Sequence, residues 1–492
     1  MTESQPIQLT EEHADGSDLR VMLMLAWPMV VTTMSRTVMQ FVDTFWLSRL
    51  GVGHAAAAAV GGILCFSVIG FALGVMTVVN TFASQCLGRK EYDKCSAYAW
   101  QGLWLAVMLG AGAVLLWPAI PAVVRFFGHE SQLQDMERQF MQISLLSVAP
   151  SAAAMALASF FNGVHRPKVA MWSAIAANLF NVVADYVLIF GALGFPRLEV
   201  AGAALATVAA TVFRVGFLLV ALWWGSARRH FASRRTWGIQ PSRIMDLLKI
   251  GWPIGLQWAA DVSAWAMFLT WLVGSFGKVH IAASQFVFQY LHVSFMPAVG
   301  VGIAISAAVG RAIGEGRLDL AERRFRVGLK LCCGYMGAMG VVFLLFGGTL
   351  ISVFSKDPEV LHLGRWMMVF AAVFQVFDGM CVSYNSGLKG AGDTRWPAMV
   401  AVSLCWLVVV GGGWLAVQFW PEAKSFGPWG ASTTFIIILS MVLGYRWRSG
   451  AWRRIKLFAH ERGAPAADML AATEDELVPA VQPAIGKTDG GE

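Results

Sequence analysis

The chain has 492 residues, of which 57% are hydrophobic and 14% are charged, and its formal net charge is +7. Soluble domains carry about 25% charged residues, so this composition excludes an ordinary soluble protein. The connections between apolar stretches are too short to hide a soluble catalytic domain. The positive charge does not require nucleic-acid binding, because it gathers in loops on one side of a membrane.

Long apolar stretches predict membrane-spanning helices, each of which needs about 20 mainly apolar residues. Twelve such stretches lie near residues 21–48, 55–83, 95–118, 139–161, 169–190, 200–225, 248–276, 281–309, 325–353, 363–387, 397–419 and 428–446. A transmembrane β-barrel would instead show alternating polar and apolar residues. The predicted fold class is therefore an all-α polytopic membrane protein with twelve transmembrane helices.

The sequence repeats itself at a spacing of about 226 residues. Thr44, Gly51, His54, Ala56, Gly74-Val75 and Gly88 recur as Thr270, Gly277, His280, Ala282, Gly300-Val301 and Gly314. Nearby spacings relate Trp27-Pro28 to Trp252-Pro253 and Gly202-Ala203 to Gly430-Ala431. Such regular recurrence indicates duplication, which is typical of two-lobed transporters. We expect two pseudo-symmetric bundles of six helices.

These features divide the chain into five parts. They are a polar N-terminus (1–20), an N-lobe (21–225), an inter-lobe linker (226–247), a C-lobe (248–446) and a basic segment with a disordered tail (447–492). Lysine and arginine gather in alternate connections, near residues 89–94, 166–168, 228–243, 311–324 and 389–395. Because basic loops favour the cytoplasmic side, we expect a multi-pass protein of the cell (inner or plasma) membrane with both termini and the linker in the cytoplasm.

The sequence contains neither a zinc-protease motif nor a nucleotide-binding P-loop. Leu133 stands where a zinc motif beginning at His129-Glu130 would need its second histidine, and no P-loop sequence occurs. The seven cysteines form no Cys-x-x-Cys pair. We therefore expect no enzymatic activity, no catalytic residues, no cofactor and no resident metal.

Four acidic residues lie inside apolar stretches: Asp43, Asp185, Asp261 and Asp378. An acid inside a span costs about 2.5–3.5 kcal/mol on insertion scales, and such residues usually line ion or substrate paths. None is matched by an acid in the other repeat; their counterparts are Leu269, Gly412, Ser35 and Ser151. The asymmetry suggests that each lobe has its own chemistry.

Asp185 belongs to a polar helix face with Asn178 and Asn181. Amide and carboxylate oxygens suit a hard cation and equally suit a proton site, and Thr207 on the next span can add a hydroxyl. The alternative is that Asn178, Asn181 and Asp185 join helices through hydrogen bonds.

The other intramembrane charges also allow two interpretations. Asp43 could form an ion pair with Arg36, seven residues earlier on the same helix face. Asp261 and Asp378 have no basic residue within one turn of their own helices, so burial would favour their neutral form and allow proton exchange. Each could instead be a polar residue beside a water-filled cavity. Arg214 fits a snorkelling or paired structural cation better than a substrate ligand.

Pro28 and Pro253 occupy equivalent places in the first helix of each lobe. Proline removes a backbone hydrogen bond and kinks a helix. The two residues are therefore hinge candidates, with a static kink as the alternative.

Several motifs together resemble the MATE (multidrug and toxic compound extrusion) transporters. They are Phe41–Gly51, Thr81–Gly88, Asn181–Asp185 with Gly202–Thr207, and Phe374–Gly379 with Gly387–Arg395. The resemblance covers roughly residues 20–450. It implies two six-helix bundles around a central cleft and the export of organic cations in exchange for Na⁺ or H⁺.

The resemblance also implies two sites. The N-lobe cation site would use Asp43, Asn181, Asp185 and Thr207. The C-lobe site of the NorM-type branch would use Asp261 and Asp378, with Gln285 at a polar position of the following helix. That branch commonly has Glu where this chain has Asp261, and the shorter side chain leaves open whether it meets an ion directly or through water.

We therefore predict a secondary antiporter that exports lipophilic organic cations by alternating access of two lobes. Transported Na⁺ or H⁺ would be the coupling ion, and Na⁺ would bind at Asp43, Asn181 and Asp185. The expected partners are small cationic substrates and the lipid bilayer, without nucleic acid, and the expected state is a monomer. One alternative is a lipid-linked oligosaccharide or polysaccharide flippase of the same superfamily, which would need basic residues in its cleft. Another is a non-coupled channel or receptor.

Overall fold

The computed structural model describes residues 16–48, 52–127, 131–224, 230–455 and 457–458. Within these ranges twelve helical spans are long and apolar enough to cross a membrane, and no strand occurs. The predicted all-α fold with twelve transmembrane helices is confirmed. Most of the polar N-terminus, residues 226–229 of the expected linker, and the tail from residue 459 lie outside the described residues.

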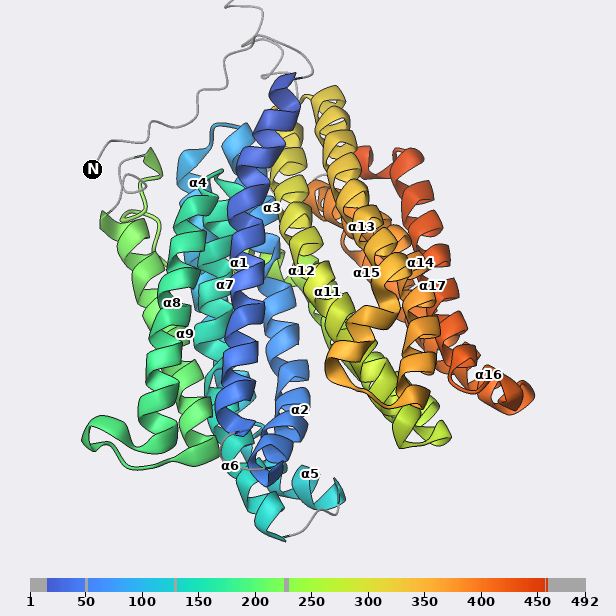
Figure 1. The fold of residues 1–492 in the computed structure, drawn as a ribbon. Coiled ribbons are helices and arrows are strands. Elements are labelled where there is room, and N and C mark those ends of the chain that lie inside the picture. The colour runs from blue at the N-terminus through green and yellow to red at the C-terminus, as the bar shows by residue number, and fades with distance from the viewer. Residues whose placement is uncertain (1–15, 49–51, 128–130, 225–229, 456, 459–492) are drawn as a thin grey trace, which may run out of the picture. The chain divides into compact units, whose positions relative to one another are not determined.

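The first six spans form the N-lobe, coloured blue to green in Figure 1. They are α1 (Gly16–Ser48), α2 (Val52–Met76) continued by α3 (Val78–Gly88), α4 (Tyr92–Val114), α6 (Ser131–Leu146) continued by α7 (Val148–Gly163), α8 (Pro167–Phe190) and α9 (Glu199–Trp224), with the short α5 (Ile120–Phe127) before α6. Pro167 begins α8, where its missing N–H leaves no gap in the helix, and Gly191 ends it with a left-handed φ of 75°.

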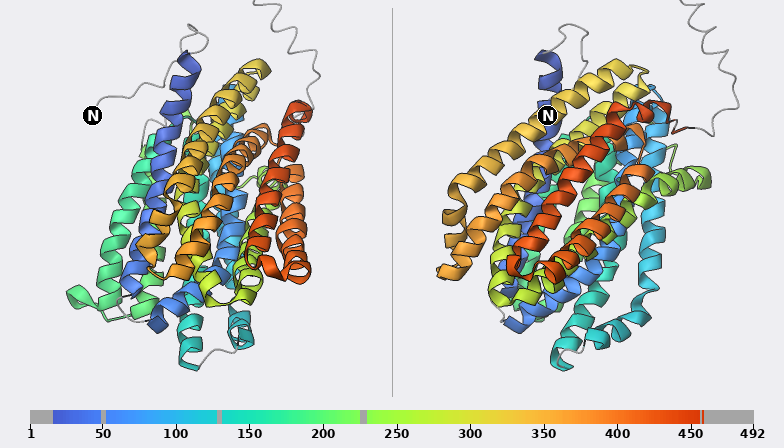
Figure 2. Two further views of the ribbon diagram at one scale, coloured as in Figure 1. Left: turned by 45° about the vertical axis from the view of Figure 1, so that its right-hand side comes forward. Right: turned by 90° about the vertical axis from the view of Figure 1, so that its right-hand side faces the viewer.

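The remaining spans form the C-lobe. They are α11 (Pro241–Met267), α12 (Lys278–Gly314), α13 (Leu318–Phe354), α14 (Pro358–Ala391), α15 (Arg395–Leu404) with α16 (Gly413–Phe419), and α17 (Phe426–Arg448). π-helical turns at Phe268–Val273 and Cys405–Gly412 extend α11 and α15. Figure 2 shows α17, in red, beside α14, in orange, and the two helices pack together. α11 starts at Pro241, inside the stretch that the sequence assigned to the linker.

Both hinge candidates lie inside continuous helices. α1 runs through Pro28 and α11 runs through Pro253 without a break in the helix. The Thr32 hydroxyl donates a 2.8 Å hydrogen bond to the carbonyl oxygen of Pro28. A hinge motion at these prolines stays a prediction.

The repeated glycines mark the places where the two lobes touch. A Cβ added to Gly74 of α2 would lie 2.8 Å from the Cα of Gly255 in α11. At the equivalent place in the other repeat, a Cβ on Gly300 of α12 would lie 2.6 Å from the Cα of Val30 in α1. Only glycine allows backbones to approach this closely. The recurrence of Gly74 as Gly300 therefore follows from the pseudo-symmetric contact of the lobes.

The lobes also meet at the end of the bundle that carries the connections 89–91, 164–166, 315–317 and 392–394, the upper end in Figure 1. This end is named the basic end here. The Thr81 hydroxyl donates a 2.9 Å hydrogen bond to the Lys389 carbonyl, and the Gln85 amide donates one of 2.9 Å to the Gly390 carbonyl. A Cβ on Gly88 would lie 2.2 Å from the Arg311 carbonyl oxygen. The lobes are therefore in direct backbone contact at the basic end.

His165, in the connection between α7 and α8, adds a polar contact across the same interface. Its ring nitrogens lie 3.4 Å from the Ala307 carbonyl oxygen and 3.2 Å from a guanidinium nitrogen of Arg311 on α12. Burial, and then the charges of Arg311 and Arg324, lower the pKa of His165 to about 3. The imidazole is therefore neutral at physiological pH. Protonation of the ring would place a second positive charge beside Arg311 and weaken the contact between the lobes.

Candidate functional site

The N-lobe acids Asp43 and Asp185 come together where α1 packs against α8. Their carboxyl groups are close enough to affect each other's charge. Asp185 is fully buried, and neither of its carboxyl oxygens has a hydrogen-bond partner within the described part of the chain. Two carboxylates at short range in a low-dielectric environment cannot both stay charged without a cation or a proton between them. This pair can therefore bind a metal cation, a proton or a cationic substrate.

Polar side chains extend the acid pair along α8. Asn181 is fully buried one turn from Asp185, and among the described residues neither its amide oxygen nor its amide nitrogen has a hydrogen-bond partner. The amide nitrogen of Asn178 also lacks a partner among these residues. Buried polar atoms are rarely left unpaired. The helix-joining alternative predicts hydrogen bonds from these residues, and none forms within the described part of the chain.

Thr207 lies on α9, which packs against α8. Its hydroxyl donates a 3.1 Å hydrogen bond to the carbonyl of Ala203 in its own helix. No interaction joins Thr207 to Asp185 among the described residues, so its place in the cation site stays a prediction.

The C-lobe acids Asp261 and Asp378 lie on different helices. Asp378 on α14 is 8% exposed and acts electrostatically on the thiols of Cys332 in α13 and Cys381 in α14. Asp261 on α11 is half-buried, with Gln257 as a polar neighbour. No interaction joins Asp261 to Asp378 in the part of the chain that the structure describes. Gln285, on α12, is exposed.

Lys389 is a cationic neighbour of Asp261 that sequence reasoning missed. It lies in the last turn of α14, within a membrane span, although its sequence position suggested a loop. The Lys389 ammonium and the Asp261 carboxyl group are close enough for each to stabilise the charged form of the other. The sequence showed that no basic residue lies within one turn of Asp261 on its own helix, and it held no signal for a base on a helix more than a hundred residues away.

Arg36 and Arg214 are a second departure from expectation. The ion pair of Arg36 with Asp43 does not form within the described residues, although the spacing allows it. Arg36 instead lies within electrostatic range of Arg214 on α9 and His292 on α12. Among the described residues, the buried Nε of Arg214 has no hydrogen-bond partner. The sequence-based interpretation of Arg214 as a paired cation therefore finds no acidic partner in the described part of the chain.

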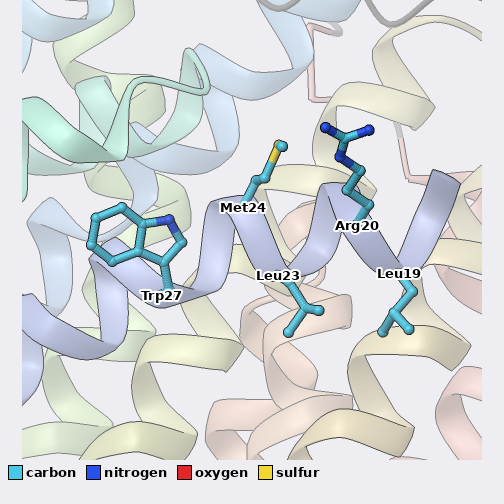
Figure 3. A pocket seen from close by; sticks show the side chains of 5 residues that line it. All are labelled: Leu19, Arg20, Leu23, Met24 and Trp27. Atoms are coloured by element: carbon cyan, nitrogen blue, oxygen red, sulfur yellow. The ribbon is translucent and has the colours of Figure 1, made fainter. Parts of the chain in front are cut away.

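No group of three His, Cys, Asp or Glu side chains that could hold a metal occurs among the described residues. Figure 3 shows a hollow elsewhere on the surface, lined by Leu19, Arg20, Leu23, Met24 and Trp27. All five come from a single stretch of α1 that bears none of the four intramembrane acids. This hollow is therefore separate from the candidate site.

A duplicated twelve-helix bundle with acidic side chains inside the spans of each lobe is typical of a multi-pass membrane transporter. The family model MatE matches residues 28–187 and 259–415. A probable multidrug resistance protein NorM from Mesorhizobium japonicum is 30% identical over 445 residues, which are 89% of this chain and 95% of that protein. Another from Chromobacterium violaceum is 30% identical over 432 residues, covering 86% and 91%. The chain belongs to the MATE family, whose members are transporters and not enzymes.

Solved structures share the fold at lower identity. A MOP superfamily transporter from Pyrococcus furiosus, described as having a binding pocket of reverse polarity, superimposes with a TM-score of 0.80 at 19% identity, covering 89% of this chain and 97% of that one. An outward-facing multidrug resistance MATE transporter gives the same TM-score, identity and coverage. These similarities support the fold.

Proposed function

We propose that this protein is a multidrug efflux antiporter that exports lipophilic organic cations in exchange for Na⁺ or H⁺. The relatives named as probable multidrug resistance proteins support drug export. The observation that carries the coupling is the pair of half-buried Asp43 and fully buried Asp185, in which neither oxygen of Asp185 has a hydrogen-bond partner among the described residues. A site that requires one positive charge can exchange a drug cation for a metal ion or a proton.

Competition for the acids gives the exchange its direction. An ion that enters from outside neutralises Asp43 and Asp185 and removes their attraction for a bound drug cation, which then leaves. In the C-lobe, Lys389 partly neutralises Asp261, whereas Asp378 has no basic neighbour among the described residues. Asp378 is therefore the stronger candidate for holding a drug cation in that lobe.

Alternating access then follows from the contact between the lobes. Because basic loops favour the cytoplasmic side, we infer that the basic end faces the cytoplasm and that closure there leaves the acids to be reached from outside. In the opposite state the contacts at Gly88 and Gln85 would separate and admit drug from inside. In the proposed orientation both termini are cytoplasmic, and the proposed unit is a monomer.

Ethidium efflux from proteoliposomes tests the site. Under combined inward Na⁺ and H⁺ gradients, the Asp185→Asn variant should lose at least about 90% of the wild-type rate, because an amide requires no cation. Asp135→Asn is a matched control, since Asp135 is exposed at the start of α6. Equal rates for Asp185→Asn and wild type would refute the assigned coupling site.

A further inference from the structure

The inter-lobe linker is bound along one face of α4. The part of it named the strap here, Phe231–Gln240, has no regular secondary structure. Side chains of α4 donate hydrogen bonds of 2.7–3.0 Å to strap carbonyls: Ser96 to Phe231, Trp100 to Ser233, Gln101 to Gly238 and Trp104 to Trp237. The donors share one face of α4, so the strap follows this helix for about 12 Å along its axis.

These hydrogen bonds suit a backbone that lies against lipid. Irregular backbone at membrane depth is tolerated only where the protein satisfies its polar groups, and α4, itself a membrane span, supplies the donors. Large apolar side chains of the strap stay exposed: Trp237 is 57% exposed and Ile239 is 60% exposed. Tryptophan is enriched where a membrane meets water. We therefore place the strap between α4 and the surrounding lipid.

Positive charge gathers on the same segment. Arg234 and Arg235 are exposed, and the strap contains no acidic residue. A turn closed by a 2.9 Å hydrogen bond from the Arg235 N–H to the Ala232 carbonyl fixes their backbone. The Arg234 guanidinium lies 5.6 Å from the centre of the Trp223 ring on α9, and that ring packs edge-on against Trp100. Neither arginine forms an ion pair within the described ranges.

We propose that the strap is a docking surface for an anionic phospholipid. Arg234 and Arg235 bind its phosphate, because guanidinium groups form charge-assisted hydrogen bonds with phosphate oxygens. Trp237 and Ile239 contact the upper part of its acyl chains. Charge complementarity selects this occupant, since basic segments beside a membrane attract anionic lipids and a zwitterionic lipid brings no net charge. The surface lies on α4, which bears none of the four intramembrane acids, so it goes beyond the proposed export function.

Native mass spectrometry of the full-length protein in detergent tests the surface. The probes are palmitoyl-oleoyl phosphatidylglycerol, which is anionic, and phosphatidylcholine with the same acyl chains, which is zwitterionic. The double variant Arg234→Gln/Arg235→Gln should weaken binding of the first phosphatidylglycerol molecule about tenfold or more, because each basic residue at a membrane surface strengthens anionic-lipid binding several-fold. Binding of phosphatidylcholine by this variant should change by less than about twofold.

A matched control removes the same charge elsewhere. Arg317 and Arg395 are exposed at the basic end, outside the strap, and Arg317→Gln/Arg395→Gln should weaken phosphatidylglycerol binding by less than about threefold. Equal losses in the two glutamine variants would mean that anionic lipid follows the net charge of the basic end, and would overturn the surface. Equal weakening of both lipids by the strap variant, or no weakening of either, would also overturn it.

A second strap variant separates charge from folding. Arg234→Lys/Arg235→Lys keeps both charges and should retain phosphatidylglycerol binding to within about threefold, because lysine also binds phosphate. A loss as large as that of the glutamine variant would contradict recognition through charge. Melting temperatures equal to that of the wild type show that each variant is folded.

Discussion

Substituting Gly88 by alanine should open the basic end of the transporter. The added Cβ would lie 2.2 Å from the Arg311 carbonyl oxygen and 2.8 Å from the Cα of Gly314, both of them backbone atoms that cannot rotate away. The lobes would have to separate by about 1 Å to reach normal contact, and overpacking of this kind costs about 1–3 kcal/mol. The closed state alone carries this cost, so the equilibrium should move toward the basic-end-open state by about 5- to 150-fold.

Spin labels on the two lobes measure the shift. Lys90 and Arg317 are exposed residues at the basic end, one in each lobe, and double electron–electron resonance gives the distance between labels placed there. Gly88→Ala should increase the long-distance population, whereas the control Gly216→Ala should not, because no atom lies within 4 Å of a Cβ at Gly216. An unchanged distance distribution in folded Gly88→Ala protein would refute the close backbone contact.

Three further predictions concern the same lobes. The pKa of His165 falls from an unfolded value of about 6.5 to about 3, so the folded protein loses stability as the pH drops through this range. Between pH 7 and pH 4.5 the melting temperature should therefore fall more for wild type than for His165→Gln. Equal falls would contradict the contact. Gln85→Ala removes a hydrogen bond between the lobes and should reduce stability by about 1 kcal/mol, measured by melting in detergent; an unchanged melting temperature argues against the bond. Lys389→Met removes the cation beside Asp261 and, if Asp261 contributes to the site, should tighten ethidium binding roughly three- to tenfold. Weaker ethidium binding by this variant would contradict the prediction that Lys389 opposes the binding of a cation.

Much of the fold was predictable because lipid imposes strong rules on sequence. The twelve apolar stretches predicted the twelve membrane-spanning helices, since a membrane helix must be long and apolar. The repeat gave the two lobes, and the structure adds the physical reason for its glycines: Gly74 and Gly300 lie where backbones of opposite lobes meet. The start of α11 at Pro241 was missed because its first two turns carry Arg243 and Asp246 and lie before the continuous apolar stretch.

The site was less predictable because periodicity relates residues of one helix and gives no neighbours on other helices. Asn181 and Asp185 were recognised on one face of α8, and their lack of partners agrees with a polar site. The pairing of Asp43 with Asp185, and of Asp261 with Lys389, joins helices far apart in the chain. Same-helix spacing favoured Arg36 as the partner of Asp43, and the structure places it beside another arginine instead.

The central claim is that the acid pair couples drug export to an inward cation gradient. The most direct measurement loads ethidium into proteoliposomes at equal concentration on both sides and imposes a Na⁺ gradient, and in a separate experiment a pH gradient. The account predicts uphill ethidium movement against the direction of one of these gradients, and its loss in Asp43→Asn. Ethidium that only equilibrates, at a rate independent of both gradients, would contradict antiport.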